Sequence, residues 1–323
     1  MSIAENISQS LPQLPATTTQ SGLLPLPSPF VLESGQALHG ANLAWECSGP
    51  AHAPLIVVLG GISAHRRCDA WWQAQCGNGR ALDSERFRLL SIDWLGGCDE
   101  STGPRDGESF PSVSSTDQAR AILLLLNRSG VRHVHAIVGA SYGGAVAQHL
   151  AALLGRRLGH LVVLSAAHKP SQFALALRDI QRSILDLGDD SAQALALVRA
   201  LAIVGYRTPQ GFEQRFADSD GAAAWLARHG RAFAERFNAS SYRCLSASLD
   251  SHRIDPAAIT VPTTVFSVAE DLLVPPSLSR EFAASCGGPC ELVEIASDYG
   301  HDAFLKEEVI VGDLLRRVVE KQS

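Results

Sequence analysis

The sequence predicts an α/β fold, with a doubly wound, mostly parallel β-sheet and an inserted helical cap. Three observations predict it. Continuously apolar runs, typical of parallel strands covered on both faces, alternate with helical patterns along most of the chain. A serine between glycines, in the segment 139–144, separates one of these strands from the next helix. Between about 168 and 257 the strand pattern stops, and helical patterns follow one another.

The elements of the core follow in order along the chain. Residues 41–46 mix apolar and polar side chains, as a half-buried antiparallel strand does, whereas 54–59 are continuously apolar, as in a central parallel strand. Further strand-like runs lie at 87–94, 134–138, 161–164, 265–268 and 291–295. Helical patterns lie between them at 115–127, 145–154 and 276–284. This alternation of strand and helix favours a parallel sheet.

The chain divides into three parts. Residues 1–27 are rich in Ser, Gln, Thr and Pro and are predicted to form a flexible N-terminal extension. Residues 28–167 and 258–323 are predicted to form the sheet domain, and 168–257 a helical cap over its catalytic edge. The cap helices are expected at 173–187, 191–204, 209–216 and 222–236. A cap in this place can exclude water and shape a pocket.

Length, charge and cysteine content exclude several classes of function. With 323 residues the chain can bury a large core, and its net charge of -6 argues against nucleic acid or a membrane surface as partner. The N-terminus lacks the features of a signal peptide, and no apolar stretch is long enough to span a bilayer. Seven irregularly spaced cysteines match neither a metal site nor a disulfide framework. We therefore expect a cytoplasmic protein with reduced thiols, no bound metal and a small-molecule partner.

The segment 139–144 has the pattern of the nucleophile elbow of α/β-hydrolases. Ser141 follows an apolar strand, precedes a helix and has small neighbours, as a turn with a strained nucleophile requires. The strain lifts its hydroxyl clear of the sheet, and the helix that begins next favours a negative oxygen beside it. Short glycine and serine patterns also occur in ordinary turns, but this context predicts that Ser141 is a nucleophile.

An acid and a histidine follow in the order that this fold needs. The strand-like run 263–269 leads to Asp271, and 291–295 leads to His301. His301 is the predicted base for the Ser141 proton, and Asp271 would orient its ring and stabilise its positive form. Taken singly, each is also compatible with an ordinary turn or capping residue. Three such residues at three strand ends, in this order, favour catalysis.

The negative oxygen formed by attack of the serine needs backbone N–H donors. The amide of Tyr142 is the first candidate, because it directly follows the nucleophile. The second is expected in the loop after residues 54–59, from Ile62 or Gly61. The alternative is that the glycines of this loop only permit a tight turn.

Several motifs outside the triad add a more specific signal. They are Leu38-His39-Gly40-Ala41, Trp71-Trp72 with Gly79-Arg80-Ala81-Leu82-Asp83, Leu95-Gly96-Gly97-Cys98 with Ser101-Thr102-Gly103-Pro104, and Gly300-His301-Asp302-Ala303-Phe304-Leu305. With them, the chain from about residue 28 to its end resembles the homoserine O-acyltransferases of methionine biosynthesis, a branch of the α/β-hydrolases. The resemblance implies acyl-CoA as co-substrate, no permanently bound cofactor, and a homodimer packed through the caps.

The resemblance also implies residues that bind the acceptor. Arg199, upstream of Tyr206, is similar to the arginine that grips the homoserine carboxylate, with Tyr206 as its companion. A guanidinium suits this task because its planar fork can bond both carboxylate oxygens. Asp302 is similar to the residue that meets the homoserine amino group. Alternatively, Arg199 marks the wet side of an apolar helix, and Asp302 is a solvated turn residue.

The sequence departs from the family at a few positions. Glu100 stands where the family has glycine, and Ala140 and Tyr142 replace its Asn and Met around the nucleophile. The Tyr142 side chain can narrow the space beside the oxyanion. Glu100 would disfavour an acyl group with a terminal carboxylate if it points inward, and otherwise lies in solvent. The predicted cap is also shorter than is usual in the family.

Together these features predict a ping-pong acyltransferase. Ser141 takes an acyl group from acyl-CoA, and the hydroxyl of L-homoserine, deprotonated by His301, takes it from the serine. The product is an O-acylhomoserine, with acetyl favoured over succinyl as the acyl group. The alternatives are a serine-dependent carboxylic-ester hydrolase, an acyltransferase acting on L-serine, and a non-enzymatic binding module that keeps the fold.

Overall fold

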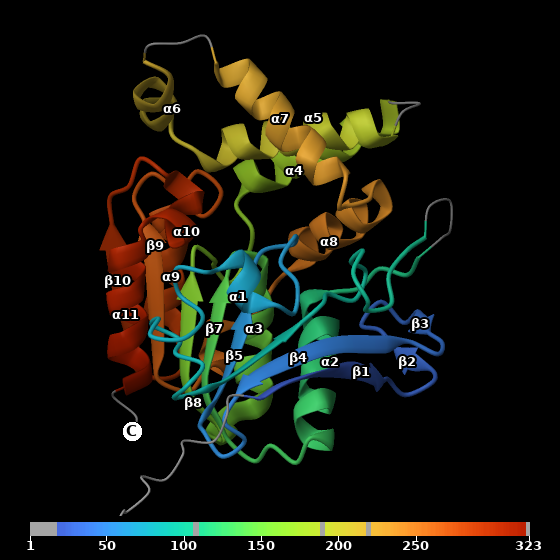
Figure 1. Cartoon of the computed structure of the whole chain (residues 1–323), viewed down its shortest axis with the longest axis vertical. Coiled ribbons are helices and arrows are strands. Elements are labelled where there is room, and N and C mark those ends of the chain that lie inside the picture. The colour runs from blue at the N-terminus through green and yellow to red at the C-terminus, as the bar shows by residue number, and fades with distance from the viewer. Residues whose placement is uncertain (1–17, 106–109, 188–190, 218–220, 321–323) are drawn as a thin grey trace, which may run out of the picture.

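A computed structural model of the chain describes residues 18–105, 110–187, 191–217 and 221–320. Its main sheet carries helices on both faces and a group of helices above one edge (Figure 1). The strands of this eight-stranded sheet are β1 Thr18–Pro25, β4 Asn42–Gly49, β5 Leu55–Leu59, β6 Arg88–Ile92, β7 Val134–Ala140, β8 Leu158–Leu164, β9 Thr263–Val268 and β10 Cys290–Ile295. A separate small sheet pairs β2 Phe30–Val31 with β3 Ala37–Leu38. The α-helices of the sheet domain are α1 Cys68–Trp71, α2 Ser115–Arg128, α3 Tyr142–Leu154, α9 Pro276–Ser285, α10 Ala303–Lys306 and α11 Glu308–Glu320.

The order of strands across the main sheet is β1-β4-β6-β5-β7-β8-β9-β10. From β6 to β10 all neighbours pair in parallel, whereas β4 and β1 add an antiparallel edge. Parallel neighbours need crossover connections, and the connecting helices cover both faces. The predicted α/β-hydrolase fold is therefore confirmed, with element ends that differ from the predicted ones by a few residues.

The central strand β5 shows why the parallel strands of this sheet have continuously apolar sequences. Leu55, Val57 and Leu59 belong to a core shared with α2 and α3, whereas Ile56 and Val58 belong to a second core with α11. Successive side chains of a strand lie on opposite faces, so a strand covered on both sides must be apolar throughout. All five residues of β5 are buried.

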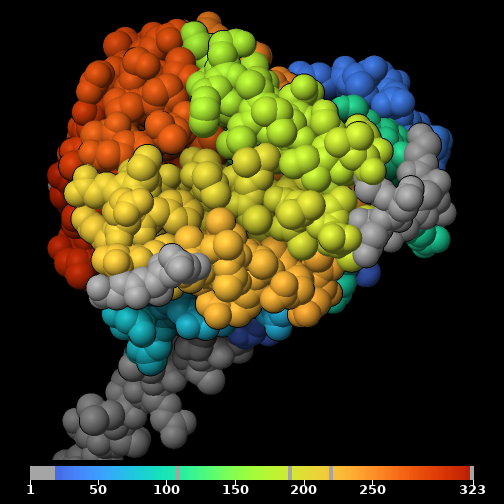
Figure 2. Space-filling model, turned by 90° about the horizontal axis from the view of Figure 1, so that it is seen from above, coloured from blue at the N-terminus to red at the C-terminus, as the bar shows by residue number. Residues whose placement is uncertain are grey.

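The described residues between β8 and β9 form the cap helices α4 Gln172–Leu187, α5 Ser191–Tyr206, α6 Pro209–Phe216, α7 Ala222–Ala234 and α8 Ala239–Ser251. They lie above the carboxyl ends of the parallel strands (Figure 1) and spread across that face of the molecule (Figure 2). The sequence did not predict α8, because three of its five buried residues are serines and no apolar stripe marks it. Across the described ranges, none of the helices has the length and apolarity needed to cross a membrane.

The N-terminal segment differs from the flexible extension predicted for residues 1–27. Residues 18–25 form the edge strand β1, which pairs antiparallel with β4, and Leu24 and Leu26 are buried. A polar composition did not reveal this strand, because an edge strand is held largely by backbone hydrogen bonds and needs few apolar contacts. Residues 1–17 of the predicted extension lie outside the described residues.

Candidate active site

Ser141 stands at the sharp turn between β7 and α3. Its backbone has φ 53° and ψ −119°, a conformation that is strained for a residue with a side chain. The glycines around it are required by space: a Cβ at Gly143 would lie 2.3 Å from the Leu59 carbonyl oxygen, and one at Gly139 would lie 2.5 Å from the Gly143 oxygen. The predicted elbow geometry is thus present, with the serine at its tip.

A chain of hydrogen bonds joins the three predicted triad residues. Ser141 Oγ lies 2.9 Å from His301 Nε2, and His301 Nδ1 lies 2.7 Å from Asp271 Oδ2. Asp271 follows β9 and is 2% exposed, and its other oxygen accepts the amides of Leu273 and Val274, each at 2.9 Å. Both carboxylate oxygens of Asp271 are therefore engaged in hydrogen bonds. The histidine ring is oriented by a carboxylate whose own position is fixed by two backbone amides.

The protonation of His301 follows from its surroundings. Burial by itself lowers the pKa of the imidazole, but the charge and hydrogen bond of Asp271 more than offset it, so the pKa is raised above its ordinary value. Because Nδ1 donates to Asp271, the neutral ring presents Nε2 as an acceptor to the Ser141 hydroxyl. This arrangement can take a proton from the serine and stabilise the imidazolium that results.

The predicted oxyanion donors come from two segments, the start of α3 and the loop after β5. The Tyr142 amide is the first of α3, and amides of a first turn have no acceptor within their helix. Gly61 and Ile62 follow β5 and line the same cavity as Ser141. The Gly61 carbonyl accepts a hydrogen bond from Trp94 Nε1 at 3.0 Å, and the Gly143 amide of the elbow donates to the Gly60 carbonyl at 2.8 Å. Donation by these amides to an oxyanion stays a prediction.

The side chains that depart from the family lie away from the reacting atoms. The Tyr142 ring is fully buried, its hydroxyl lies 2.8 Å from Ser248 Oγ, and it packs on Trp94. It does not narrow the space beside the oxyanion, so that expectation is wrong. Glu100 is ion-paired with Arg66, has a side chain that is 64% exposed, and does not line the cavity.

A cavity of about 420 Å³ lies between the triad and the cap. Ser141 and His301 line it from below, and Arg199 and Tyr206 line it from α5. The guanidinium of Arg199 lies 5.7 Å from the centre of the Tyr206 ring, and the structure gives it no acidic partner within the described ranges. Arg199 can therefore accept a carboxylate without breaking an ion pair.

Asp302 also lines the cavity, but it already has a partner. Its Oδ2 accepts a hydrogen bond from Arg207 Nε at 2.8 Å. The second carboxylate oxygen has no hydrogen-bond partner among the residues that the structure describes. One carboxylate oxygen of Asp302 is thus left available, while Arg207 fixes the position of the other. Binding of an amino group by Asp302 stays a prediction.

Among the cap residues that line the cavity, Arg178 and Gln181 were not predicted from the sequence. Both lie on α4, and both are buried. A signal was present, since the buried residues of α4 are Ala174, Arg178, Gln181 and Leu185, at spacings of a helix face. A charged and a polar residue on the buried stripe of an amphipathic helix need partners, which marks them as candidates.

Comparison with known proteins decides the family. Residues 54–308 match the model of the alpha/beta hydrolase fold family. A homoserine O-succinyltransferase of Xanthomonas campestris pv. campestris is 38% identical over 286 residues, covering 82% of this chain and 75% of that protein. The chain belongs to the homoserine O-acyltransferase family. Its predicted resemblance to this family of methionine biosynthesis is confirmed.

The relatives of this homoserine O-acyltransferase family member differ in the acyl group that they carry. A homoserine O-acetyltransferase of Corynebacterium diphtheriae is 28% identical over 337 residues, covering 90% of this chain and 92% of that protein. The crystal structure of esterase E22 matches with a TM-score of 0.81 at 17% identity, over 94% of this chain and 100% of that one. A likeness at that identity shows the shared fold only. Among the described residues no cluster of His, Cys, Asp or Glu could hold a metal ion.

Proposed function

We propose that this protein is a homoserine O-acyltransferase, which transfers a short acyl group from acyl-CoA to the hydroxyl of L-homoserine. The observation that carries the proposal is the hydrogen-bonded chain from Asp271 through His301 to Ser141, opening into a cavity where Arg199 has no acidic partner among the described residues. The triad supplies an activated hydroxyl, and the arginine supplies a place for the carboxylate of an amino acid. Membership of the family supports the same assignment.

The first half-reaction loads the serine. Ser141 Oγ attacks the thioester carbon while its proton passes to His301 Nε2, and the amides of Tyr142 and of Gly61 or Ile62 stabilise the negative oxygen. The C–S bond then breaks, and the CoA thiol leaves with the proton from His301. Asp271 keeps the ring oriented throughout and stabilises its charged form.

The second half-reaction unloads the serine onto the acceptor. The carboxylate of L-homoserine is held by Arg199, with Tyr206 beside it, and the amino group is held by Asp302. His301 takes the proton of the acceptor hydroxyl as that oxygen attacks the acyl carbon. The bond between the acyl carbon and Ser141 Oγ then breaks, and His301 returns the proton to that serine oxygen. Orientation by these residues and exclusion of water by the cap favour transfer over hydrolysis.

The test uses purified protein and the release of free thiol from acetyl-CoA or succinyl-CoA. We expect release that depends on L-homoserine, and its loss in Ser141→Ala. Release without an acceptor would instead indicate an ester or thioester hydrolase, since the same triad serves both reactions. Faster thiol release with L-serine than with L-homoserine would identify L-serine as the acceptor. No thiol release with any combination of donor and acceptor would favour a binding module.

Two further properties belong to this proposal. We infer a cytoplasmic enzyme, supported by the free thiol state of all seven cysteines. We also infer a homodimer packed through the caps, as the family resemblance implies. Sedimentation of the purified protein measures whether it is a dimer. Substitution of the exposed apolar side chains of the cap by alanine should weaken that dimer.

A further inference from the structure

Arg178 is a buried cation in the active-site cavity to which the transfer described above gives no role. It lies on α4, is 9% exposed, and lines the cavity together with Ser141 and His301. Its positive charge acts on the proposed base, since it lowers the pKa of His301 against the larger raising effect of Asp271. The cap therefore holds this guanidinium within electrostatic reach of the reacting atoms.

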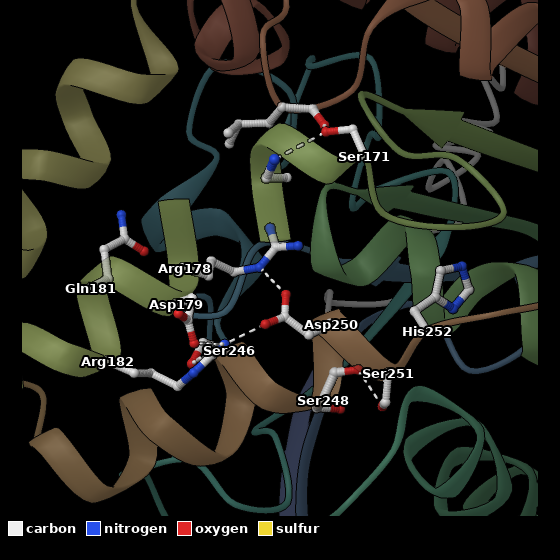
Figure 3. Close-up of polar contacts among 12 residues, drawn as sticks. Ser171, Arg178, Asp179, Gln181, Arg182, Ser246, Ser248, Asp250, Ser251 and His252 are labelled. Atoms are coloured by element: carbon white, nitrogen blue, oxygen red, sulfur yellow. Dashed lines mark hydrogen bonds and ion pairs between the residues drawn. The ribbon is translucent and has the colours of Figure 1, made fainter. Parts of the chain in front are cut away.

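The hydrogen bonds of Arg178 use only one side of its guanidinium. Its Nε donates to Asp250 Oδ1, and Asp250 Oδ2 pairs with Arg182 at 2.7 Å (Figure 3). The terminal nitrogens Nη1 and Nη2 have no hydrogen-bond partner within the described ranges, and Nη2 is buried. Both point away from Asp250 in Figure 3. Since a buried charged donor without an acceptor is costly, this pair of nitrogens favours an anionic ligand.

The balance of charge around Arg178 points the same way. Arg178 and Arg182 share the single carboxylate of Asp250, which is itself largely buried. The other acid beside them, Asp179, lies 3.7 Å from Arg182 with a side chain that is 78% exposed, so it contributes little. One buried carboxylate thus serves two guanidinium groups, and a second one at the terminal nitrogens would restore balance.

The acceptor does not supply that second carboxylate. L-homoserine has one carboxylate, which the proposed function assigns to Arg199, and an acetyl group offers no charge to Arg178. Glu100, which would repel an anionic acyl group, lies outside the cavity lining. Asp302 is the acid that lines the cavity, within the part of the chain that the structure describes, and it is paired with Arg207.

We propose that Arg178 binds a terminal carboxylate of the acyl group, so that the donor is the CoA thioester of a short dicarboxylic acid, such as succinyl-CoA. The inference rests on the proposed acyl transfer and names its donor, in place of the acetyl group that the sequence favoured. The bound carboxylate takes no part in the chemistry. Ser141 Oγ bonds to the thioester carbon, the C–S bond breaks, and the serine proton leaves on the CoA thiol by way of His301.

The test compares succinyl-CoA with butyryl-CoA, which match in length but end in a carboxylate and a methyl group. Thiol release at saturating L-homoserine gives kcat/KM for each donor. We expect succinyl-CoA to be favoured roughly 10- to 100-fold, as loss of a charged hydrogen-bonded pair implies. Arg178→Gln should bring this ratio to about one. Arg182→Gln is the matched control, since Arg182 shares Asp250 but does not line the cavity, and it should keep the ratio.

The outcomes separate this inference from the proposed function. If the unaltered protein uses butyryl-CoA or acetyl-CoA as well as succinyl-CoA, with release that depends on homoserine, Arg178 has no such role and the transferase stands. If no donor gives homoserine-dependent release, the transferase proposal fails, and the inference fails with it. If Arg178→Gln raises the KM for L-homoserine and leaves the donor ratio unchanged, Arg178 binds the acceptor. The ratio in the unaltered protein decides the matter even if the variant does not fold.

Discussion

The rim of the sheet and the cap treat their polar groups in opposite ways. At the rim, Ser141, His301 and Asp271 form an unbroken chain of hydrogen bonds, and the acid is fully engaged. In the cap, Arg178 and Arg199 line the same cavity with donors that the described parts of the protein leave unpaired. The rim is therefore organised before any ligand arrives, whereas the cap is matched to anions that come with the substrates. We therefore infer that the sheet edge carries out the chemistry and that the cap selects the substrates.

The largest expected effect breaks the rim. Asp271→Asn removes the charge that holds the His301 ring in its catalytic tautomer, so kcat should fall about 10⁴-fold. The KM values for both substrates should change little, because neither substrate contacts the acid. An increase in KM with unchanged kcat, measured by steady-state thiol release, would contradict the division of roles between the triad and the cap.

A smaller effect is expected from the cap. Arg199→Met removes the proposed partner of the homoserine carboxylate, and the KM for L-homoserine should rise roughly 10- to 100-fold, with loading of Ser141 from acyl-CoA preserved. Arg199→Lys keeps the charge without the planar fork, so its KM for L-homoserine should lie between those of the unaltered protein and Arg199→Met. Equal KM values in all three proteins would show that the acceptor is held elsewhere.

The pH dependence sharpens the description of the rim. Transfer needs neutral His301, and Asp271 raises the pKa of this imidazole, so kcat/KM should decline as the pH falls through a value above the ordinary 6.5. Below that point the decline should be about tenfold per pH unit. In Asp271→Asn the residual activity should show this limb at lower pH, because the main raising cause is gone. If the acidic limb of the kcat/KM profile lies at the same pH in Asp271→Asn, the titrating group is not His301.

The smallest effect concerns the bond that joins the sheet domain to the cap. Ser248→Ala on α8 leaves the buried Tyr142 hydroxyl without this partner, at a cost of about 1–3 kcal/mol. Thermal unfolding should begin a few degrees lower, by about 2–4 °C per kcal/mol in a chain of this size. Activity at 25 °C should stay within about twofold. A large loss of activity would mean that cap position, and not only cap residues, controls the chemistry.

Much of the fold and of the rim was predictable, because local rules dictate it. β5 is apolar at every position since both of its faces are covered. The elbow is visible because only glycine fits two positions before and two positions after Ser141, as the short approaches at Gly139 and Gly143 show. Asp271 and His301 each follow a strand whose carboxyl end must lie at the same edge of a parallel sheet. The parallel pairing of these neighbouring strands then brings the three together.

The remaining features depend on packing between distant segments. The Tyr142 side chain is buried in the core, where its hydroxyl shares a hydrogen bond with Ser248, more than a hundred positions away. β1 exists because β4 offers it an edge, which its polar composition does not reveal. Arg178 falls on the buried stripe of α4, but its burial and its shared partner Asp250 are what identify it as a candidate. Such contacts leave little trace in a local pattern.

An acyl group on Ser141 is detected by the mass of the intact protein, quenched after mixing with acyl-CoA and no acceptor. We expect a covalent adduct of one acyl group, located on Ser141 by peptide analysis, absent in Ser141→Ala, and discharged when L-homoserine is added. Transfer to homoserine without any loaded serine, under conditions where turnover is observed, would contradict the proposed mechanism.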